Sequence, residues 1–421
     1  MGKLRLSEKE RLRIEVLSKV KAGKLTLRKG ADFLGLSYRQ MLRVQERYVS
    51  AGNAGLKHGL RDRGSNRKIS AERRERVLKL YEGKYGDFGP TLATEYLRKT
   101  DGEDVGIETL RRWLVEAGLW TPGRKGSGHR KWRERKAHFG EMVQMDGSLH
   151  DWFEGRGGKA SLMVMIDDAT NWTYAEFHDE ETTVAAMKVF WGYVERYGLP
   201  RSVYVDRDTI YKTTRDSTVD EALSAEPPRT QFGRAMDELG VELILAHSPQ
   251  AKGRVERRHG VFQDRLVKGM RLKGISTLAQ ANKYLEEEFL DEMNERFNVP
   301  AREKADVHRC VRRGVKLAHV LSYQEERVVQ NDWTISWCNR HFQLSAEHHR
   351  LMLAKKRIKV SELLDGTIRL EHRGRELKFV ELKERPSRKK AKAAKEASKM
   401  ATSKAPHKPA ANHSWRRPFL K

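Results

Sequence analysis

Apolar residues recur every three or four positions through the first fifty residues, with basic and polar residues between them. This spacing predicts a helix over 7–20, a short helix over 26–34 and a third helix over 38–49. Gly35 marks a tight turn between the second and the third helix, because glycine tolerates backbone conformations that other residues avoid. Helix, short helix, glycine turn and helix is the order of a helix-turn-helix domain, which we place at residues 1–52.

The same order of predicted helices then repeats. Apolar positions with helical spacing predict helices over 71–82, 89–97 and 107–117, and we interpret residues 70–120 as a second helix-turn-helix domain. The residues between the two domains, 53–69, are rich in glycine and basic side chains, and this composition is typical of a linker that follows a nucleic-acid groove.

From about residue 141 the pattern changes to short apolar runs that alternate with longer amphipathic stretches. The runs predict five strands and the stretches predict three helices. The strands are expected at 143–147, 162–167, 172–177, 202–205 and 241–246, and the helices at 181–197, 231–239 and 249–272. Three strands followed by helix, strand, helix, strand and helix is the order of an α/β ribonuclease H-like domain with a mixed sheet, placed at 141–275. The basic, glycine-rich residues 121–140 before it are interpreted as a linker.

The last third of the chain predicts three further segments. Residues 276–324 begin as a helix and are interpreted as a helical connector. Residues 325–382 carry short alternating runs separated by turn signals such as Asp365-Gly366, which predicts a small β-barrel. Residues 383–421 hold 13 Lys or Arg against two Glu and are expected to be a disordered basic tail. The chain is therefore expected to be multidomain, with all-α, α/β and all-β parts.

Composition indicates the kind of partner. The 84 Lys and Arg against 58 Asp and Glu give a net charge of 84 − 58 = +26, which predicts salt-dependent binding to a polyanion such as nucleic acid. No apolar run is long enough for a transmembrane helix, and the N-terminus lacks an apolar signal core, so we expect no membrane partner. Two cysteines are too few for a disulfide framework or a four-cysteine zinc site, which fits a reducing, cytoplasmic setting.

Basic and amide side chains stand where a helix-turn-helix domain contacts double-stranded DNA. The residue types that bind base edges and phosphates occur on the third helix of each predicted domain and in the linker between the domains. The candidates are Arg39, Gln40, Arg43 and Arg47 on the first such helix, Arg63 and Arg67 in the linker, and Arg111 and Arg112 on the second such helix. The alternative for each helix is an ordinary solvated basic face.

Three acidic residues form the candidate catalytic group. Asp146 ends the apolar run at 142–145, Asp206 ends the run at 203–205, and Glu256 follows Pro249 within a predicted helix. Carboxylates at strand ends and on a helix can converge in space, and such groups suit Mg²⁺ or Mn²⁺. Two ions in one site can stabilise both the attacking and the leaving oxygen of a phosphodiester displacement. The ordinary alternative is that each aspartate only caps a turn.

The run Ser-Pro-Gln-Ala-Lys-Gly-Arg-Val-Glu-Arg at 248–257, together with Asp146 and Asp206, resembles the acidic motif of DDE transposases and retroviral-type integrases. The whole layout is similar to bacterial insertion-sequence transposases of the ISNCY-like type. The resemblance is most specific over 143–260 and extends in architecture over about 7–380. One departure is that Arg207-Asp208 follows Asp206, where the family commonly has Asn-Gly, so Asp208 remains an alternative to Asp206.

The resemblance implies a role for each residue. Asp146 would bind both metal ions, Asp206 one ion and Glu256 the other, in a site of two Mg²⁺ (or Mn²⁺). Lys252, Arg254 and Arg257 are expected to contact DNA phosphates, and His259 is a candidate for orienting a phosphate or water. The ordinary alternative for Lys252 and His259 is an exposed helix position. The weakly patterned residues 207–230 are interpreted as a loop inserted beside the site.

The implied function is DNA integration. A polynucleotidyl transferase of this kind binds the terminal inverted repeats of an insertion sequence, cleaves at the 3′ ends and transfers the strands into target DNA. A homodimer or higher oligomer on DNA is expected, because two ends must be joined together. Two alternatives remain open: a transposase-derived sequence-specific regulator without catalysis, and a ribonuclease H-type nuclease.

Overall fold

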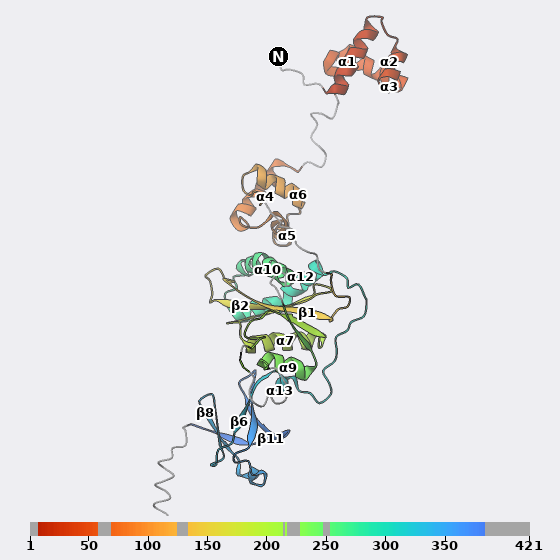
Figure 1. Cartoon of the computed structure of the whole chain (residues 1–421). Helices are drawn as coiled ribbons and strands as arrows, with labels where there is room; N and C mark the ends of the chain where they lie inside the picture. The colour runs from red at the N-terminus through yellow and green to blue at the C-terminus, as the bar shows by residue number, and fades with distance from the viewer. Residues whose placement is uncertain are drawn as a thin grey trace, which may run out of the picture. The chain divides into compact units, whose positions relative to one another are not determined.

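The computed structural model describes residues 7–57, 69–123, 134–213, 215–216, 228–246 and 253–383. The chain divides into two compact units, Met1–Gly126 and Ser127–Lys421. Figure 1 shows the helices and strands of both units and labels many of them. Within the described residues, no helix is both long enough and apolar enough to cross a membrane.

The first unit begins with three helices in the predicted positions. They are α1 (Glu8–Lys21), α2 (Leu27–Phe33) and α3 (Tyr38–Ala51), followed by a short helix η1 (Gly52–Leu56). Ser7 and Glu10 form a capping box at the start of α1, and Ser37 and Gln40 form another at the start of α3. Gly35 lies between α2 and α3 with φ +62°, a left-handed conformation that glycine adopts without strain. The three helices enclose a small core that contains Val16, Leu17, Ala31, Met41, Val44 and Leu56.

The second group of helices in this unit has its own core. It consists of α4 (Ala71–Lys84), α5 (Pro90–Thr100) and α6 (Ile107–Glu116). Aromatic rings dominate the packing: Tyr85, Phe88 and Tyr96 contact one another in tilted and edge-on arrangements. Two three-helix groups therefore form as expected; their interpretation as DNA-binding helix-turn-helix domains stays a prediction.

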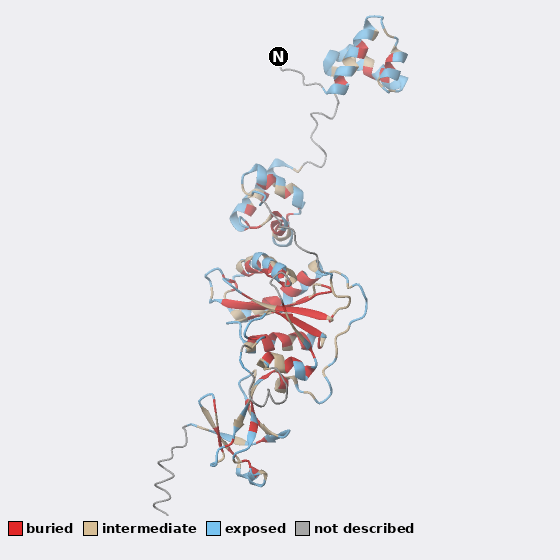
Figure 2. Cartoon of the chain, in the orientation of Figure 1, coloured by how far each residue is buried: buried red, intermediate tan, exposed pale blue. Residues whose placement is uncertain are grey.

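A five-stranded mixed sheet forms the centre of the second unit. Its strands are β1 (Met142–His150), β2 (Ala160–Asp167), β3 (Thr173–His178), β4 (Ser202–Val205) and β5 (Glu242–Leu245). They lie in the order β3-β2-β1-β4-β5. β1 pairs antiparallel with β2 and β2 with β3, whereas β1 pairs parallel with β4 and β4 with β5. All eight residues of β2 are buried, as expected for a strand covered on both faces (Figure 2). The predicted mixed α/β core is confirmed.

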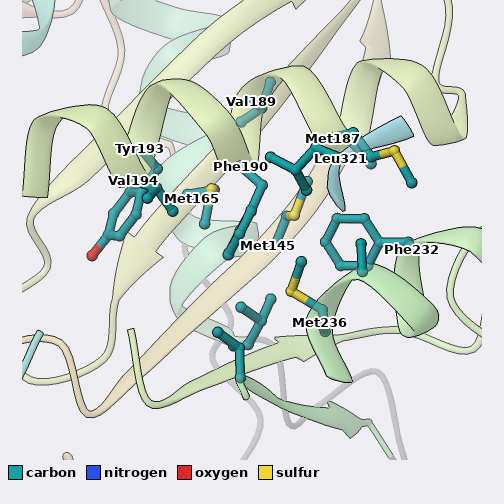
Figure 3. Packing of buried hydrophobic residues seen from close by; sticks show 14 of the residues in the cluster. Met145, Met165, Met187, Val189, Phe190, Tyr193, Val194, Phe232, Met236 and Leu321 are labelled. Atoms are coloured by element: carbon teal, nitrogen blue, oxygen red, sulfur yellow. The ribbon is translucent and has the colours of Figure 1, made fainter. Parts of the chain in front are cut away.

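Helices cover both faces of this sheet. On one face, α7 (Thr183–Tyr197) and α9 (Gln231–Leu239) pack on the strands through a cluster that includes Met145, Met165, Phe190 and Phe232 (Figure 3). On the other face lies α10 (Gly253–Leu272), which buries Val255, Phe262, Leu266 and Met270. The expected start of this helix at Pro249 lies outside the described residues.

The helices after α10 belong to the core. These are α11 (Leu278–Tyr284), η3 (Leu285–Phe289) and α12 (Leu290–Phe297), which bury Ala281, Tyr284, Leu285, Phe289, Leu290 and Met293 against the same face as α10. The expectation that residues 276–324 are only a connector is therefore wrong for their first part. An apolar helical stripe predicts burial, but the pattern does not say which surface covers it.

Two asparagines join these helices to the edge strand β3. Asn294 accepts a hydrogen bond from the backbone N–H of Thr173 (2.8 Å) and donates one to its carbonyl oxygen (2.9 Å). Asn282 makes the equivalent pair of bonds with Phe177. Each amide therefore satisfies the backbone of an edge residue as a neighbouring strand does, which leaves these groups of β3 unavailable for pairing with another chain.

The last described part is β-rich, as expected. A short helix α13 (Leu317–Val320) leads into β6 (Ser322–Val328), β7 (Thr334–Trp337), β8 (Arg340–Leu344), η4 (Ala346–Leu351), β9 (Arg357–Leu363), β10 (Ile368–His372), β11 (Arg375–Leu377) and β12 (Phe379–Leu382). They form two sheets, β11-β10-β9-β6 and β12-β8-β7, around one apolar core. The β content is confirmed, and closure into a barrel stays unconfirmed. The expected tail at 383–421 lies outside the described residues, except Lys383.

Candidate functional site

Asp146 lies in the interior of β1. The strand runs to His150, so the expectation that Asp146 ends it is wrong: Gly147 to His150 continue the pairing with β2. Successive side chains of a strand point to opposite faces, and Val143 and Met145 pack on the α7 side. Asp146 therefore faces the α10 side, where its Oδ2 lies 3.8 Å from Nδ1 of His259.

Asp206 follows the last residue of β4, as the sequence predicts. In the parallel pairing of β1 with β4, Gln144 is opposite Tyr204. The paired residues end there: Asp146 lies two residues beyond Gln144 in β1, and Asp206 directly follows the last residue of β4. Because paired strands lie about 4.8 Å apart, the two aspartates stand at the same end of the β1–β4 pair.

Asp208, the alternative to Asp206, holds the turn that follows β4. Its Oδ1 accepts hydrogen bonds from the backbone N–H of Ile210 (3.0 Å) and from the hydroxyl of Thr209 (3.2 Å). Its own backbone N–H donates to Oδ1 of Asp206 at 3.0 Å. The Asp208 side chain thus fills the turn-capping role common for aspartate, and it supports the loop in which Asp206 lies.

Glu256 lies in the first turn of α10 and is exposed. One helical turn further on, His259 is buried and approaches Asp146. Gln263 is one turn beyond His259, and its side-chain amide donates to Oγ of Ser148 on β1 (3.4 Å). Glu256 is therefore on the flank of α10 that runs past Asp146. Within the described residues, no three His, Cys, Asp or Glu side chains stand close enough together to hold a metal ion.

A fourth carboxylate, Glu181, stands against Gly147 of β1, the residue that follows Asp146. A Cβ atom added to Gly147 would lie 2.2 Å from Oε2 of Glu181, so glycine at this position leaves the space that the carboxylate occupies. Sequence reasoning did not find Glu181. An acidic residue just before a helix is a common feature of helix starts, so its position in the sequence carries no distinguishing signal.

Tyr211 lies close enough to these acids for their charges to act on its hydroxyl. It is buried, and within the described residues its hydroxyl has no hydrogen-bond partner. Burial raises the pKa of the Tyr211 hydroxyl well above its usual range, and the negative charges of Glu181, Asp206, Asp146 and Asp208 raise it further. Four carboxylates therefore act on one buried group. The residue type, though not a closed set of ligands among the described residues, suits Mg²⁺ or Mn²⁺, because these ions prefer carboxylate oxygen.

Two further aspartates, at the end of β2 and directly after it, have structural roles. Asp167 accepts hydrogen bonds from the backbone N–H groups of Gly140 and Thr170 and from the Thr170 hydroxyl. Burial raises its pKa, and these hydrogen bonds act in the opposite direction. Asp168 accepts from the backbone N–H of Lys136 and pairs with Arg254. Both aspartates are fully buried, which removes them as ligands for an exposed substrate.

The candidate DNA contacts on the first unit are mostly exposed. Arg39, Arg43 and Arg47 project from α3, and Arg112 projects from α6. Gln40 uses its side-chain oxygen to cap α3 at Ser37, and Arg111 pairs with Glu108. Arg63, Arg67 and Lys252 lie outside the described residues.

Arg254 does not stand where the sequence suggested. Its side chain is only 10% exposed and pairs with buried Asp168, so it stabilises the joint between α10 and β2. Arg257, four residues after Gly253 and hydrogen-bonded to the Gly253 carbonyl oxygen, is exposed. Arg258 is buried, where it donates to the carbonyl oxygen of Asn171 and lies over the ring of Phe297. Burial lowers the pKa of Arg258 to about 10.

The chain is similar to two curated proteins over most of its length. A Sinorhizobium fredii protein named as a transposase, y4bF, is 35% identical over 381 residues, which cover 90% of this chain and 82% of that protein. The transposase for insertion sequence IS1202 of Streptococcus pneumoniae is 27% identical over 398 residues, covering 84% of this chain and 82% of the relative. No protein-family model matches the chain.

Solved structures with a likeness to the chain include viral proteins. The catalytic core of HTLV-2 integrase in complex with magnesium is 15% identical, with a TM-score of 0.28, over 36% of this chain and 87% of that one. A simian T-cell lymphotropic virus intasome chain is 12% identical, with a TM-score of 0.32, over 73% of this chain and 100% of that one.

Proposed function

The chain belongs to the insertion-sequence transposases, proteins of DNA transposition and recombination, and from this premise we propose what it does. It binds the terminal inverted repeats of an insertion sequence and catalyses metal-dependent cleavage at the 3′ ends, followed by strand transfer into target DNA. The proposal rests on the position of Asp146 in β1, where it approaches His259 of α10, and on the position of Asp206 directly after the neighbouring parallel strand β4.

Asp146, Asp206 and Glu256 are the proposed metal ligands and catalytic residues. When bound, two Mg²⁺ or Mn²⁺ ions supply electrostatic stabilisation to the attacking and leaving oxygens of a phosphodiester displacement. The donor set fits these ions, because carboxylate oxygen is the ligand that hard divalent cations prefer. Asp208 is proposed to hold the turn rather than a metal, because its carboxylate already accepts bonds from Thr209 and Ile210.

The remaining residues of the site position the reacting groups. His259 lies against Asp146 from the α10 side and limits the orientations of that carboxylate. Gln263 holds α10 to β1 through Ser148, which keeps the flank of the helix that carries Glu256 at a set height over the strand. A DNA phosphodiester that enters between β1, β4 and α10 is then held in line for attack, and such positioning can account for much of the rate enhancement.

DNA recognition is proposed for the helical groups of the first unit. Helix α3 carries three exposed arginines, Arg39, Arg43 and Arg47, and α6 carries one, Arg112. Helices that enter a major groove present basic side chains in this way. Gln40 is engaged in a helix cap, so its contribution to base recognition is proposed to be smaller. A homodimer or higher oligomer on the DNA is proposed, because cleavage and joining need two transposon ends at once.

The test is an incubation of the full chain with Mg²⁺ and a labelled duplex that carries the flanking inverted repeat. We expect nicking and strand transfer by the wild-type protein, and neither reaction by Asp146→Asn at equal DNA binding. Asp264→Asn, an exposed carboxylate of α10 paired with Lys268, is the matched control and is expected to react as the wild type does. Specific binding without cleavage by any variant, in Mg²⁺ and in Mn²⁺, would favour a regulator that lacks catalysis. Cleavage that prefers hybrid or branched nucleic acid would favour a nuclease.

A further inference from the structure

A small cavity in the second unit is lined by four arginines. Its volume is about 170 Å³, several times the roughly 30 Å³ that one water occupies in the liquid. Arg254, Arg257, Arg258 and Val261 line it from α10, and the other walls are Arg135, Ile166, Asn171 and Phe297. Segments far apart in the sequence therefore bring four guanidinium groups to one opening.

The arginines have few acidic partners. Arg254 pairs with Asp168. Arg135 donates to the carbonyl oxygen of Ala169 and the side-chain oxygen of Asn171, while Arg257 and Arg258 donate to backbone carbonyl oxygens. Among the residues that the structure describes, none of these three arginines forms an ion pair. Asp168 is thus paired with Arg254, while the other three arginines of the cavity are held by uncharged oxygens among the described residues.

This arrangement is unfavourable without an anion. Like charges that share a partly enclosed space repel one another, and burial removes the water that otherwise screens them. At Arg258, burial alone lowers the pKa of the guanidinium to about 10, because the charged form is removed from water. Each guanidinium carries five N–H donors in a planar fork that matches two oxygens of a phosphate group. A bound phosphate would offset the repulsion and accept from those N–H groups of Arg135, Arg257 and Arg258 that have no other partner in the described part of the chain.

The position of the cavity on α10 favours DNA as the source of the phosphate. Arg254, Arg257, Arg258 and Val261 follow the spacing i, i+3, i+4, i+7 and so share one flank of the helix. Glu256 and Gln263, seven residues apart, share the opposite flank. A helix with its side chains is about 10–12 Å wide, so one DNA molecule can reach both flanks.

We propose that Arg135, Arg257 and Arg258 bind a backbone phosphate of DNA in this cavity while the opposite flank of α10 faces the cleavage site. The choice of DNA as ligand rests on the proposed function. Arg254 contributes to the wall and stays paired with Asp168. The contact carries no sequence information; it positions the strand relative to Asp146 and Asp206.

The test measures how DNA binding by the full chain depends on salt. The variants are Arg257→Gln and Arg135→Gln, alone and together, with Arg257→Lys to retain the charge. Arg313→Gln is the matched control. Arg313 is exposed and lies elsewhere in the same unit, and its substitution removes the same charge. Melting temperatures confirm folding, and Arg258 is left unchanged because its burial makes loss of folding the expected outcome.

The slope of log affinity against log salt is negative, and we expect it to be about 1 less steep in the double variant. This difference is the contribution of one phosphate contact. Arg257→Lys restores most of the affinity, and Arg313→Gln leaves the slope as in the wild type. Replacing DNA phosphates one at a time by neutral methylphosphonates identifies the contacted position: one replacement weakens binding by the wild type and has no effect on the double variant.

Three results would overturn the inference. One is a double variant with the slope and affinity of Arg313→Gln. Another is equal sensitivity of wild type and double variant to every methylphosphonate. The third is stabilisation of the wild type by inorganic phosphate alone, with no methylphosphonate effect, which would assign the cavity to a free anion. A failure of the proposed function would appear in the cleavage assay and not in this binding assay, because DNA binding is measured here without metal-dependent cleavage.

Discussion

His259 on α10 places Nδ1 of its imidazole 3.8 Å from Oδ2 of Asp146 on β1, and both side chains are largely buried. This contact joins the helix that carries Glu256 to the strand that carries Asp146. A second group that orients a metal-binding carboxylate limits its motion and tunes its affinity for the ion.

Replacing His259 should therefore weaken catalysis through Asp146. We expect His259→Ala to lower the metal-dependent cleavage rate about 10–100-fold, the usual effect of losing an orienting partner, with little change in DNA affinity. Cleavage rates over a range of Mg²⁺ concentrations check this prediction, because a positioning role raises the Mg²⁺ requirement. A variant with the wild-type rate and Mg²⁺ dependence would show that His259 serves packing alone.

Substitutions of the two acids after β4, Asp206 and Asp208, should have different effects on cleavage and on stability. Asp206→Asn is expected to abolish cleavage and leave the melting temperature nearly unchanged. Asp208→Ala is expected to keep cleavage and lose about 1 kcal/mol of stability, because it removes the oxygen that accepts the hydrogen bonds closing the turn. Cleavage assays and denaturant titrations on both variants measure the two effects. The reverse pattern would assign the metal to Asp208.

Asn294 should contribute strongly to stability. It is 1% exposed and satisfies both backbone groups of Thr173, so Asn294→Ala leaves a buried donor and a buried acceptor without partners. We expect a loss of about 3 kcal/mol in the free energy of unfolding, measured in urea. Asn298→Ala, an exposed residue just after α12, is the control and should stay within about 0.5 kcal/mol of the wild type. A small effect at Asn294 would mean that α12 is only loosely attached to the sheet.

The stability of the second unit should decrease in mild acid because of His178. Burial, followed by the charge of Lys188, lowers the pKa of this histidine from 6.5 to about 4. The unfolded chain therefore binds a proton at a pH where the folded chain does not. The stabilisation is complete above pH 6.5 and is lost as the pH falls towards 4.

The check is a set of urea titrations at several pH values on the wild type and on His178→Gln. The variant should lose less stability than the wild type between pH 6.5 and pH 4. Parallel curves for the two proteins would show that other groups cause the acid dependence.

Local patterns were enough for most elements. Helical spacing placed α1, α3 and α4 within a few residues of their observed bounds, and apolar runs placed β2, β4 and β5. Asp206 was found because a run of apolar residues stops directly before it. These features depend on neighbours within a few positions, and the sequence records such neighbours directly.

Contacts between distant residues were not accessible in this way. Arg254 was expected at the surface, but it pairs with Asp168, 86 positions away. Asp146 was expected at the end of a strand, but pairing with β2 extends β1 to His150. Glu181 came to light only because its carboxylate lies against Gly147. In each case a strand or helix from elsewhere in the chain supplies the partner.

The sequence by itself therefore determined the order of elements, the basic charge and the acidic residues that resemble a transposase motif. Only the tertiary structure decided which flank of α10 faces Asp146, which arginines are buried in structural contacts, and that α11 and α12 complete the core. The physical reason is that burial and pairing depend on which surfaces meet. Helical and strand periodicity specifies that a face is apolar, whereas the sheet order β3-β2-β1-β4-β5 selects what covers it.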